Sequence, residues 1–284
     1  MEIIELTEDN VEEYSEYLGP DKAENIGREY YRGIVVINEK KVPESAAIWE
    51  LLHLEDEEKD TEARVETLLA SDESAAEVLL NEFEHHFEED DVRKSYLELP
   101  ADEKIFTPEL LEKAGYSCSR GESREIEILL GDLLKMPIAR KNKAPSYIKE
   151  LGSLMVRPFR RGVMDCIFHS KRPLMDDLGT ISMSWFDQQI SSYVETDGRV
   201  SGFLLIHKTP LKKMRIEVFS ASGPDARKDL LYMIIFSLKQ AEKYYSPDTE
   251  VLLRRKDESV KALTDYLLPD ITGKEMLCAS REEG

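Results

Sequence analysis

Cysteine is scarce in this chain, and the cysteines present are scattered. Cys118, Cys166 and Cys278 are odd in number and form no Cys-x-x-Cys pair. A small disulfide-linked domain needs an even set of cysteines, and structural zinc sites bring cysteines together in close pairs. The sequence argues against both, and we expect reduced, mostly buried thiols.

Long apolar runs are also lacking. A membrane-spanning helix needs about 18 or more consecutive apolar residues, and no such run occurs. The first residues, MEIIELTEDN, do not join a basic segment to an apolar one as a secretory signal does. We therefore expect a cytoplasmic protein that does not contact a membrane.

Positive charge is in deficit. The chain has 38 Lys and Arg residues against 58 Asp and Glu residues, for a formal net charge of -20. Proteins that bind nucleic acids present clustered Lys and Arg to the phosphate backbone, so we predict no nucleic-acid partner. The deficit lies in the first half: residues 1–142 hold 38 acids and 16 bases, whereas residues 143–284 hold 20 acids and 22 bases. The two halves therefore differ in charge: the first is strongly acidic and the second is nearly neutral.

The length of 284 residues suits two domains of about 140 residues each. A basic segment that contains proline, KMPIARKNKAP, lies near the middle and interrupts the pattern of strands and helices. This segment sets the predicted boundaries: an N-terminal domain over residues 1–134, a linker over 135–145 and a C-terminal domain over 146–284.

The clearest local pattern lies in residues 189–245. Apolar runs flank the Asp197-Gly198 pair, which suits the positive φ angles of a tight hairpin turn. A third alternating strand, residues 214–220, leads through a Gly-Pro corner at Gly223 into a long apolar helix. The first turn of such a helix offers unpaired N–H groups and the positive end of the helix dipole, where a pyrophosphate group would bind.

The same order of elements occurs in both halves. In the first half, residues 31–53 have a hairpin pattern, residues 64–70 form a third strand and residues 72–87 form a long helix with apolar residues at helical spacing. In the second half, residues 147–154 and 159–168 are predicted helices that precede the hairpin. A repeat of this length is typical of duplicated domains, because solenoid units are much shorter.

The succession of strand, helix, hairpin, third strand, long helix, strand and a short helix ending in Ala114-Gly115-Tyr116 resembles the GNAT superfamily of acyl-CoA-dependent N-acetyltransferases. The resemblance extends over nearly the whole chain, once in each half, and the layout is similar to that of tandem GNAT-like proteins of Firmicutes. It implies a mixed α/β (α+β) fold of two tandem acyl-CoA N-acyltransferase-like domains. Each domain would be a mostly antiparallel mixed sheet flanked by helices.

The resemblance implies acetyl-CoA as the acetyl donor, because the superfamily binds it with a Q/R-x-x-G-x-G/A loop between the third strand and the long helix. In the first half, residues 70–78 contain no glycine and place Asp72 and Glu73 where a diphosphate would bind. We assign no cofactor to that half.

In the second half, residues 220–231 read SASGPDARKDLL and keep one glycine. The resemblance places the contacts to acetyl-CoA at or beside this segment, on Phe219, Ser220, Gly223, Ala226, Arg227 and Lys228. The sequence leaves one alternative open: Gly-Pro-Asp is also how an ordinary helix begins, without any ligand.

Acetyl transfer needs a base that takes the amine proton and an acid that protonates the CoA thiolate, while a backbone N–H polarises the thioester carbonyl. Glu217, on the third strand, is the candidate base, directly or through water. Tyr266 resembles the position of the superfamily's thiolate-protonating tyrosine. In the alternative interpretation Glu217 faces solvent and Tyr266 is a packed aromatic residue.

A Glu82-x-x-His85 spacing in the first half is no metal site in this interpretation, because a di-iron bundle requires a second such helix and further glutamates. Glu82 and His86 instead suit a solvated helix face, and we predict no metal. The Trp185-Phe186 pair precedes the hairpin and either lines an acceptor cleft or belongs to the core.

These patterns predict an N-acetyltransferase that moves an acetyl group from acetyl-CoA to an amine of a small molecule or peptide, with the activity in the C-terminal domain. The alternative is a binding or interaction module that keeps the fold and transfers no acyl group. The acceptor and the oligomeric state stay open.

Overall fold

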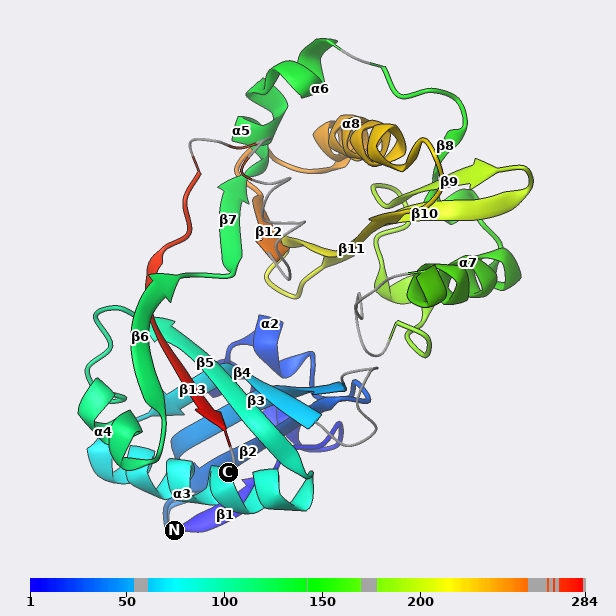
Figure 1. The fold of residues 1–284 in the computed structure, drawn as a ribbon. Helices are drawn as coiled ribbons and strands as arrows, with labels where there is room; N and C mark the ends of the chain where they lie inside the picture. Colours follow the sequence, from blue (N-terminus) through cyan, green and yellow to red (C-terminus); the bar gives the residue numbers. More distant parts are fainter. Residues whose placement is uncertain are drawn as a thin grey trace. The chain divides into compact units, whose positions relative to one another are not determined.

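The computed structural model describes residues 1–53, 61–141, 143–169, 178–254, 265, 268 and 271–282. The chain forms two compact units (Figure 1). Unit 1 comprises Met1–Ser123 and Thr272–Gly284, and unit 2 comprises Arg124–Ile271. Each unit contains one mixed sheet with helices on its faces, so the predicted mixed α/β fold is confirmed.

The sheet of unit 1 has seven strands, and its neighbours are antiparallel except for β4 and β5, which run parallel. In spatial order the strands are β1 (Glu2–Glu5), β2 (Tyr31–Ile37), β3 (Pro43–His53), β4 (Thr61–Ala70), β5 (Val92–Pro100), β13 (Glu275–Glu282) and β6 (Ser117–Glu122).

Helices cover both faces of this sheet. Helix α3 (Glu73–Glu89) and α4 (Pro108–Lys113) pack on one face, and α1 (Val11–Leu18) and α2 (Pro20–Ala23) pack on the other. The space under α3 is filled by aromatic rings: Trp49 of β3 lies 5.4 Å from Phe83 and 5.8 Å from Phe87, between ring centroids. Aromatic residues at helical spacing therefore give unit 1 a densely packed core.

The sheet of unit 2 has six strands, with β11 and β12 as its parallel pair. In spatial order the strands are β7 (Glu125–Leu129), β12 (Glu250–Arg254), β11 (Met214–Ala221), β10 (Arg199–Lys208), β9 (Ser192–Thr196) and β8 (Ile148–Glu150). The predicted hairpin is confirmed as β9 and β10, with positive φ angles at Asp197 and Gly198.

The long helix α8 (Ala226–Tyr244) packs on one face of this sheet, together with α5 (Leu130–Lys135) and α6 (Pro137–Lys141). Helix α7 (Val156–His169) packs on the other face. Residues 147–154 were expected to be helical; instead Ile148–Glu150 form edge strand β8, because Ile148 pairs with Val194 of β9. A short 3-10 turn, Leu151–Ser153, follows.

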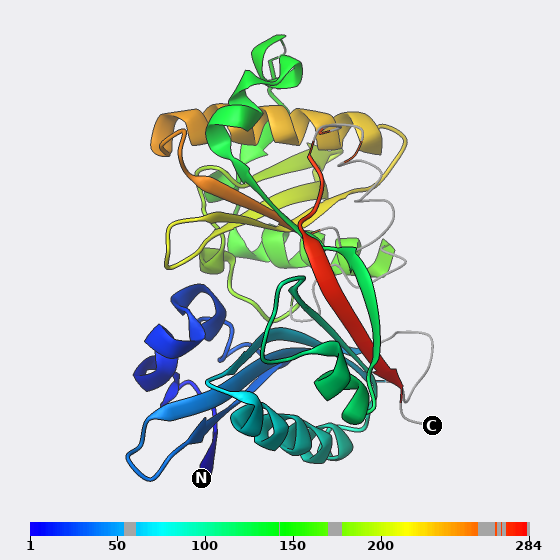
Figure 2. The same cartoon turned by 90° about the vertical axis from the view of Figure 1, so that its left-hand side faces the viewer.

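Unit 1 is built from two separate segments of the chain, and unit 2 is the continuous segment between them. Strand β13 comes from the end of the chain but lies between β5 and β6 of unit 1 (Figures 1 and 2), whereas β7 directly follows unit 1 in sequence and pairs with β12 of unit 2. The chain therefore passes from unit 1 to unit 2 between residues 123 and 124, and it returns to unit 1 between residues 271 and 272. The predicted linker, residues 135–145, falls on α6 and its flanks, where Ala139 and Ala144 contribute to the core under α8.

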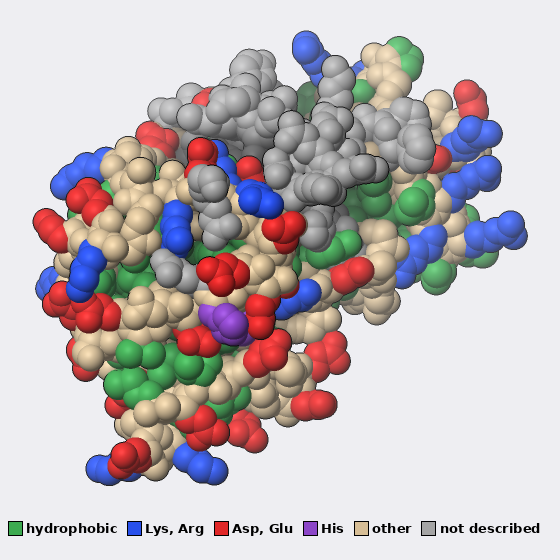
Figure 3. All heavy atoms as spheres, turned by 60° about the horizontal axis from the view of Figure 1, so that its bottom comes forward, with side chains coloured by type: hydrophobic (Ala, Val, Ile, Leu, Met, Phe, Trp, Pro, Cys, Tyr) green, Lys and Arg blue, Asp and Glu red, His purple; other side chains and the backbone are tan. Residues whose placement is uncertain are grey.

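Within the described residues, no helix is long and apolar enough to span a membrane. Acidic side chains are spread over much of the face in Figure 3, with Lys and Arg side chains between them. The acidic majority agrees with the net charge of -20.

Candidate functional site

The parallel strands β11 and β12 of unit 2 pair over only part of the length of β11. They pair from Met214 with Val251 to Ile216 with Leu253. Beyond Ile216, β11 continues to Ala221 with β10 as its partner among the described strands. The end of the parallel pairing therefore falls within β11, directly before Glu217.

Glu217 directly follows the last residue of β11 that pairs with β12, and it is the extra residue of a β-bulge. Ile216 pairs with Ile206 and Val218 pairs with Leu205, so Glu217 has no opposite residue on β10. A bulge re-aims the side chains that follow it. Phe219 accordingly packs in the cluster under α8, while Val218 packs in the cluster under α7.

The carboxylate of Glu217 is buried in an ion pair with Arg215. The Nε of Arg215 lies 2.5 Å from Oε1 of Glu217, and the side chains are 3% and 1% exposed. The alternative in which Glu217 faces solvent is therefore wrong, because the bulge turns its side chain onto the α7 face beside Arg215. A buried charge needs such a partner, since desolvation of an unpaired carboxylate is costly.

A histidine that the sequence interpretation overlooked lies beside this ion pair. His207 pairs across the strands with Arg215 and stacks on Trp185, with 4.0 Å between ring centroids and 6° between the planes. Its Nδ1 lies 2.7 Å from the backbone oxygen of Trp185. Trp185 thus borders the ion-pair region, whereas Phe186 belongs to the core, 6.3 Å from Phe159.

The residues predicted to bind acetyl-CoA follow in one continuous segment, the end of β11 and the start of α8. Gly223 has φ of +94°, and a Cβ at this position would meet nothing within 4 Å. Arg227 and Lys228 are exposed in the first turn of α8, and Lys228 lies 5.9 Å from the ring of Tyr232. This end of the helix is open to an approaching anion and carries two cations.

The same segment also has features that compete with an anion. The N–H of Ala226 donates to the oxygen of Gly223, and the N–H of Lys228 donates to the oxygen of Asp225. Asp229 points inward and accepts a hydrogen bond of 3.1 Å from the hydroxyl of Tyr147. Asp225, the N-cap residue, makes no capping hydrogen bond with its side chain.

Ser220 and Phe219 face opposite sides of β11. Ser220 forms a hydrogen bond with the buried Cys166 of α7, and burial raises the pKa of that thiol to about 11. Phe219 faces α8 and lines a cavity there. The predicted contact residues are therefore contiguous in the chain, but their side chains are divided between the two faces of the sheet.

Unit 1 contains the same bulge with a different helix start. Ile48 pairs with Thr67 and Trp49 pairs with Val65, so Glu66 is the extra residue. The side chain of Asp72 accepts a hydrogen bond of 2.9 Å from the N–H of Ala75. A carboxylate already occupies the helix N-terminus in unit 1, which is the physical reason that an anion is disfavoured there.

An Arg-x-Glu triplet precedes both loops and is the sequence signal that was overlooked. The triplet is Arg64-Val65-Glu66 in unit 1 and Arg215-Ile216-Glu217 in unit 2. In unit 1 the charges pair differently, because Arg64 lies 3.5 Å from Glu50 and Glu66 lies 3.2 Å from Lys22 of α2.

Two further predictions concern Tyr266 and metal binding. Tyr266 lies outside the described residues. His85 and His86 each approach Glu89, at 3.4 and 3.6 Å. His85 is exposed, whereas His86 is largely buried beside the ring of Trp49, so His86 does not lie on the solvated helix face predicted for it. In the part of the chain that the structure describes, no group of three or more His, Cys, Asp or Glu side chains could hold a metal ion.

Two mixed sheets, each with a bulged strand, one parallel pair and a long helix after the bulged strand, define a duplicated acyltransferase-like fold. No protein-family model and no curated protein matches the sequence. Solved structures do match it. A tandem GNAT protein from the clavulanic acid biosynthesis pathway, in a structure without acetyl-CoA, has a TM-score of 0.62 and 11% identity, over 100% of this chain and 98% of its own.

Two other structures agree. A GCN5-related N-acetyltransferase from Sphaerobacter thermophilus has a TM-score of 0.52 and 12% identity, over 99% of this chain and 95% of its own. A putative acetyltransferase from Pyrococcus horikoshii has a TM-score of 0.54 and 10% identity, over 100% of this chain and 89% of its own. The chain therefore has a tandem GNAT fold, and the predicted resemblance is confirmed at the level of the fold.

Proposed function

We propose that this chain is an N-acetyltransferase in which unit 2 transfers the acetyl group of acetyl-CoA to an amine of a small molecule or peptide. The observation that carries the proposal is the succession of three features along β11 and the loop after it: the end of the pairing with β12 at Ile216, the bulge at Glu217 and the start of α8 beyond Gly223, where Asp225 makes no side-chain cap. The GNAT fold of similar structures supports the same chemistry.

In the proposed reaction the amine nitrogen attacks the thioester carbonyl carbon, so a C–N bond forms and the C–S bond breaks. Glu217 accepts the proton that leaves the nitrogen, directly or through water. The thiolate of CoA takes a proton from Tyr266, a role that rests on the resemblance alone. A backbone N–H of β11 beyond Ile216 would stabilise negative charge on the carbonyl oxygen.

The donor would extend from this point along the end of β11 toward α8. Phe219 and Ser220 would flank its thioester arm, and Gly223 and Ala226 would let the backbone approach the pyrophosphate. Arg227 and Lys228 would neutralise phosphate charge, because both are exposed cations beside a helix N-terminus.

One observation favours the second candidate, a binding module without acyl transfer. The carboxylate of Glu217 is already engaged by Arg215 and is 1% exposed, whereas a base must reach its proton. An enzyme would have to loosen this pair when the acceptor binds. A module would keep it as a structural contact.

Calorimetric titration and thermal unfolding with acetyl-CoA and desulfo-CoA test the proposal, since a ligand that binds the native state stabilises it. We expect binding of both, and a sharp loss in a variant carrying Arg227→Glu and Lys228→Glu. Lys243→Glu, at the far end of the same helix, is the matched control and should bind normally. No binding at millimolar ligand would refute the enzyme. Binding without product from any amine would favour the module.

A further inference from the structure

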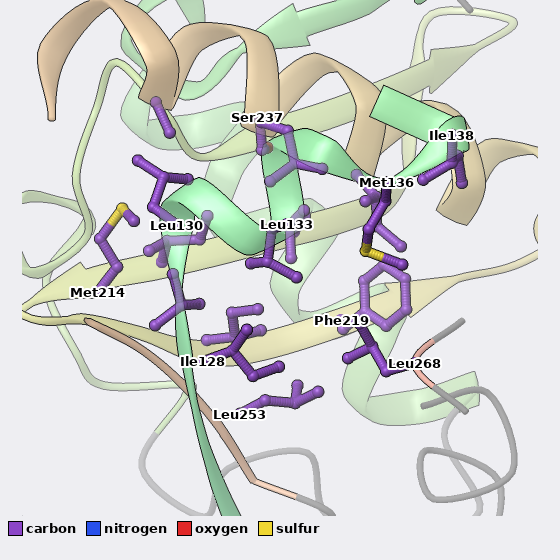
Figure 4. A pocket seen from close by; sticks show the side chains of 17 residues that line it. Ile128, Leu130, Leu133, Met136, Ile138, Met214, Phe219, Ser237, Leu253 and Leu268 are labelled. Atoms are coloured by element: carbon purple, nitrogen blue, oxygen red, sulfur yellow. The ribbon is translucent and has the colours of Figure 1, made fainter. Parts of the chain in front are cut away.

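Unit 2 contains an apolar cavity between the sheet and the helices on the α8 face. Its volume is about 110 Å³, and its walls come from β7, β10, β11, β12, α5, the α5–α6 turn and α8 (Figure 4). The exposed lining is entirely carbon and sulfur. Ser237 is its hydroxyl-bearing wall residue, and that hydroxyl pairs with Ser192 at 3.2 Å.

The same space is filled in unit 1, and the strand register shows which residues correspond. Trp49 pairs with Val65 directly before the bulge at Glu66. Ile206 pairs with Ile216 directly before the bulge at Glu217. Isoleucine thus stands in unit 2 where the central tryptophan stands in unit 1.

The helices differ in the same way. Phe83 and Phe87, four residues apart on α3, pack against Trp49. Ser237 and Ala241, four residues apart on α8, line the cavity beside Ile206. Where the tryptophan of unit 1 meets two phenylalanines of its helix, the isoleucine of unit 2 therefore meets a serine and an alanine of α8 across the cavity. The cavity has a specific origin in the sequence of unit 2.

The cavity begins where the candidate site lies. Ile216 and Leu253 are the last parallel pair of β11 and β12, and both are wall residues. Phe219, the next β11 residue on this face, is also a wall residue. Figure 4 shows Phe219, Leu253 and Leu133 directed toward the same space. A chain attached to a carbonyl held beside Phe219, on this face of β11, could enter the cavity without crossing the sheet.

We infer that this cavity binds the acyl chain of the thioester donor, so that unit 2 prefers a donor with a short aliphatic acyl group to acetyl-CoA. The inference rests on the proposed acyl transfer by unit 2. Water is a poor occupant, because a buried water needs two to four polar partners. An aliphatic chain needs none, and its transfer from water to such a lining is favourable.

The size of the cavity sets the expected chain length. An engineered apolar cavity of about 150 Å³ holds benzene, so a cavity of about 110 Å³ suits roughly four carbon atoms. Hexanoyl-CoA carries four carbons beyond its acetyl portion. Each buried methylene contributes about fourfold in affinity, and incomplete filling reduces the total. We expect hexanoyl-CoA to bind about 10- to 100-fold more tightly than acetyl-CoA.

The test compares the affinities of CoA, acetyl-CoA and hexanoyl-CoA by calorimetry, with hexanoate and hexylamine as chain-only probes. Ala241→Phe places an aromatic ring in the cavity, which Ala241 lines. It should reduce the affinity for hexanoyl-CoA to that for acetyl-CoA, and the affinity for acetyl-CoA should not change. Glu242→Phe, an exposed neighbour on α8, is the matched control and should keep the preference. If Ala241→Phe does not fold, Ser237→Leu provides a milder obstruction with the same expected direction.

The outcomes separate this inference from the function on which it rests. If none of the three CoA species binds, the proposed function fails and the acyl pocket fails with it. If all three bind equally, or if Ala241→Phe keeps the preference, the acyl pocket alone is overturned. Tighter binding of hexylamine than of hexanoyl-CoA would assign the cavity to the acceptor, and would also overturn the inference.

Discussion

Glu66 and Glu217 occupy the same place in the two sheets: each is the extra residue of a β-bulge on the strand that begins the parallel pair. Their partners differ. Glu66 pairs with Lys22 of α2, whereas Glu217 pairs with Arg215 on its own strand. The two carboxylates thus share one backbone environment, a β-bulge. Glu217 precedes α8, whose N-cap residue makes no side-chain hydrogen bond, whereas Glu66 precedes α3, which Asp72 caps.

This pair provides a matched test of the candidate base. In acyl-transfer assays, Glu217→Gln should reduce kcat/KM by about 10²- to 10⁴-fold, the usual contribution of a general base. Glu66→Gln should leave the rate within experimental error. Equal losses in both variants would indicate a structural role for the bulge carboxylates.

The Arg215–Glu217 pair should be strongly coupled in stability. Removal of one member, by Arg215→Met or Glu217→Leu, takes from a buried charge the partner that lies 2.5 Å away and should cost about 3–5 kcal/mol. The double variant should lose less than the sum of the single losses. Denaturant unfolding of the four proteins measures this coupling, and strictly additive losses would contradict it.

The two helix starts should respond differently to loss of an aspartate. Asp72→Ala removes the hydrogen bond to the N–H of Ala75 and should destabilise the protein by about 0.5–2 kcal/mol. Asp225 makes no such bond, so Asp225→Ala should change stability little. It should also strengthen binding of acetyl-CoA, because it removes a negative charge near the proposed phosphate site. Weaker binding by Asp225→Ala would argue against that site.

Unit 2 should lose stability in alkaline solution. Burial raises the pKa of Cys166 from 9.0 to about 11, and burial with the hydrogen bond to Asp229 raises that of Tyr147 from 10.0 to about 12. Both groups hold their protons more tightly when folded, so their contribution is complete below about pH 9 and is lost as pH rises through 11 and 12. A Cys166→Ser, Tyr147→Phe variant should show a flatter decline in unfolding free energy than the parent between pH 9 and 12. Identical slopes of unfolding free energy against pH in the two proteins would show that Cys166 and Tyr147 do not cause the alkaline loss of stability.

The contact between α7 and the sheet should tolerate no added methyl group at Gly162. A Cβ there would lie 2.8 Å from Cβ of Val200 and 3.0 Å from the ring of Phe203. Gly162→Ala should therefore destabilise unit 2 by about 1–3 kcal/mol, despite the better helix propensity of alanine. Gly179→Ala is the control, because its Cβ would find no atom closer than 3.9 Å. Thermal unfolding of the two variants gives the comparison.

Local patterns in the sequence were sufficient for much of the fold. The turn at Asp197-Gly198 has the predicted positive φ angles, since the preference of these residues is local. The long helices α3 and α8 follow from apolar spacing, and the repeated order of elements indicated the duplication. The buried setting of Glu217 could not be predicted, because a bulge shifts the alternation of inward and outward residues after it.

Features that depend on distant partners also escaped sequence interpretation. Residues 148–150 have no strong strand pattern and become β8 only through pairing with β9. The aromatic filling in one unit and the cavity in the other become evident only when strand register relates Trp49 to Ile206. The catalytic and donor-binding roles of Glu217, Tyr266 and the segment from Phe219 to Lys228 remain predictions.

The position of β13 between β5 and β6 has a consequence for biosynthesis. Residues 275–282 leave the ribosome after all other strands have been made, yet both of their neighbours lie in the first 122 residues. The sheet of unit 1 must therefore wait, with β5 and β6 unjoined, until translation of this segment is complete. Pairings over such sequence separations slow folding and expose strand edges meanwhile. A ribosome-bound nascent chain lacking this segment should accordingly recruit chaperones at unit 1, long after its helices have formed.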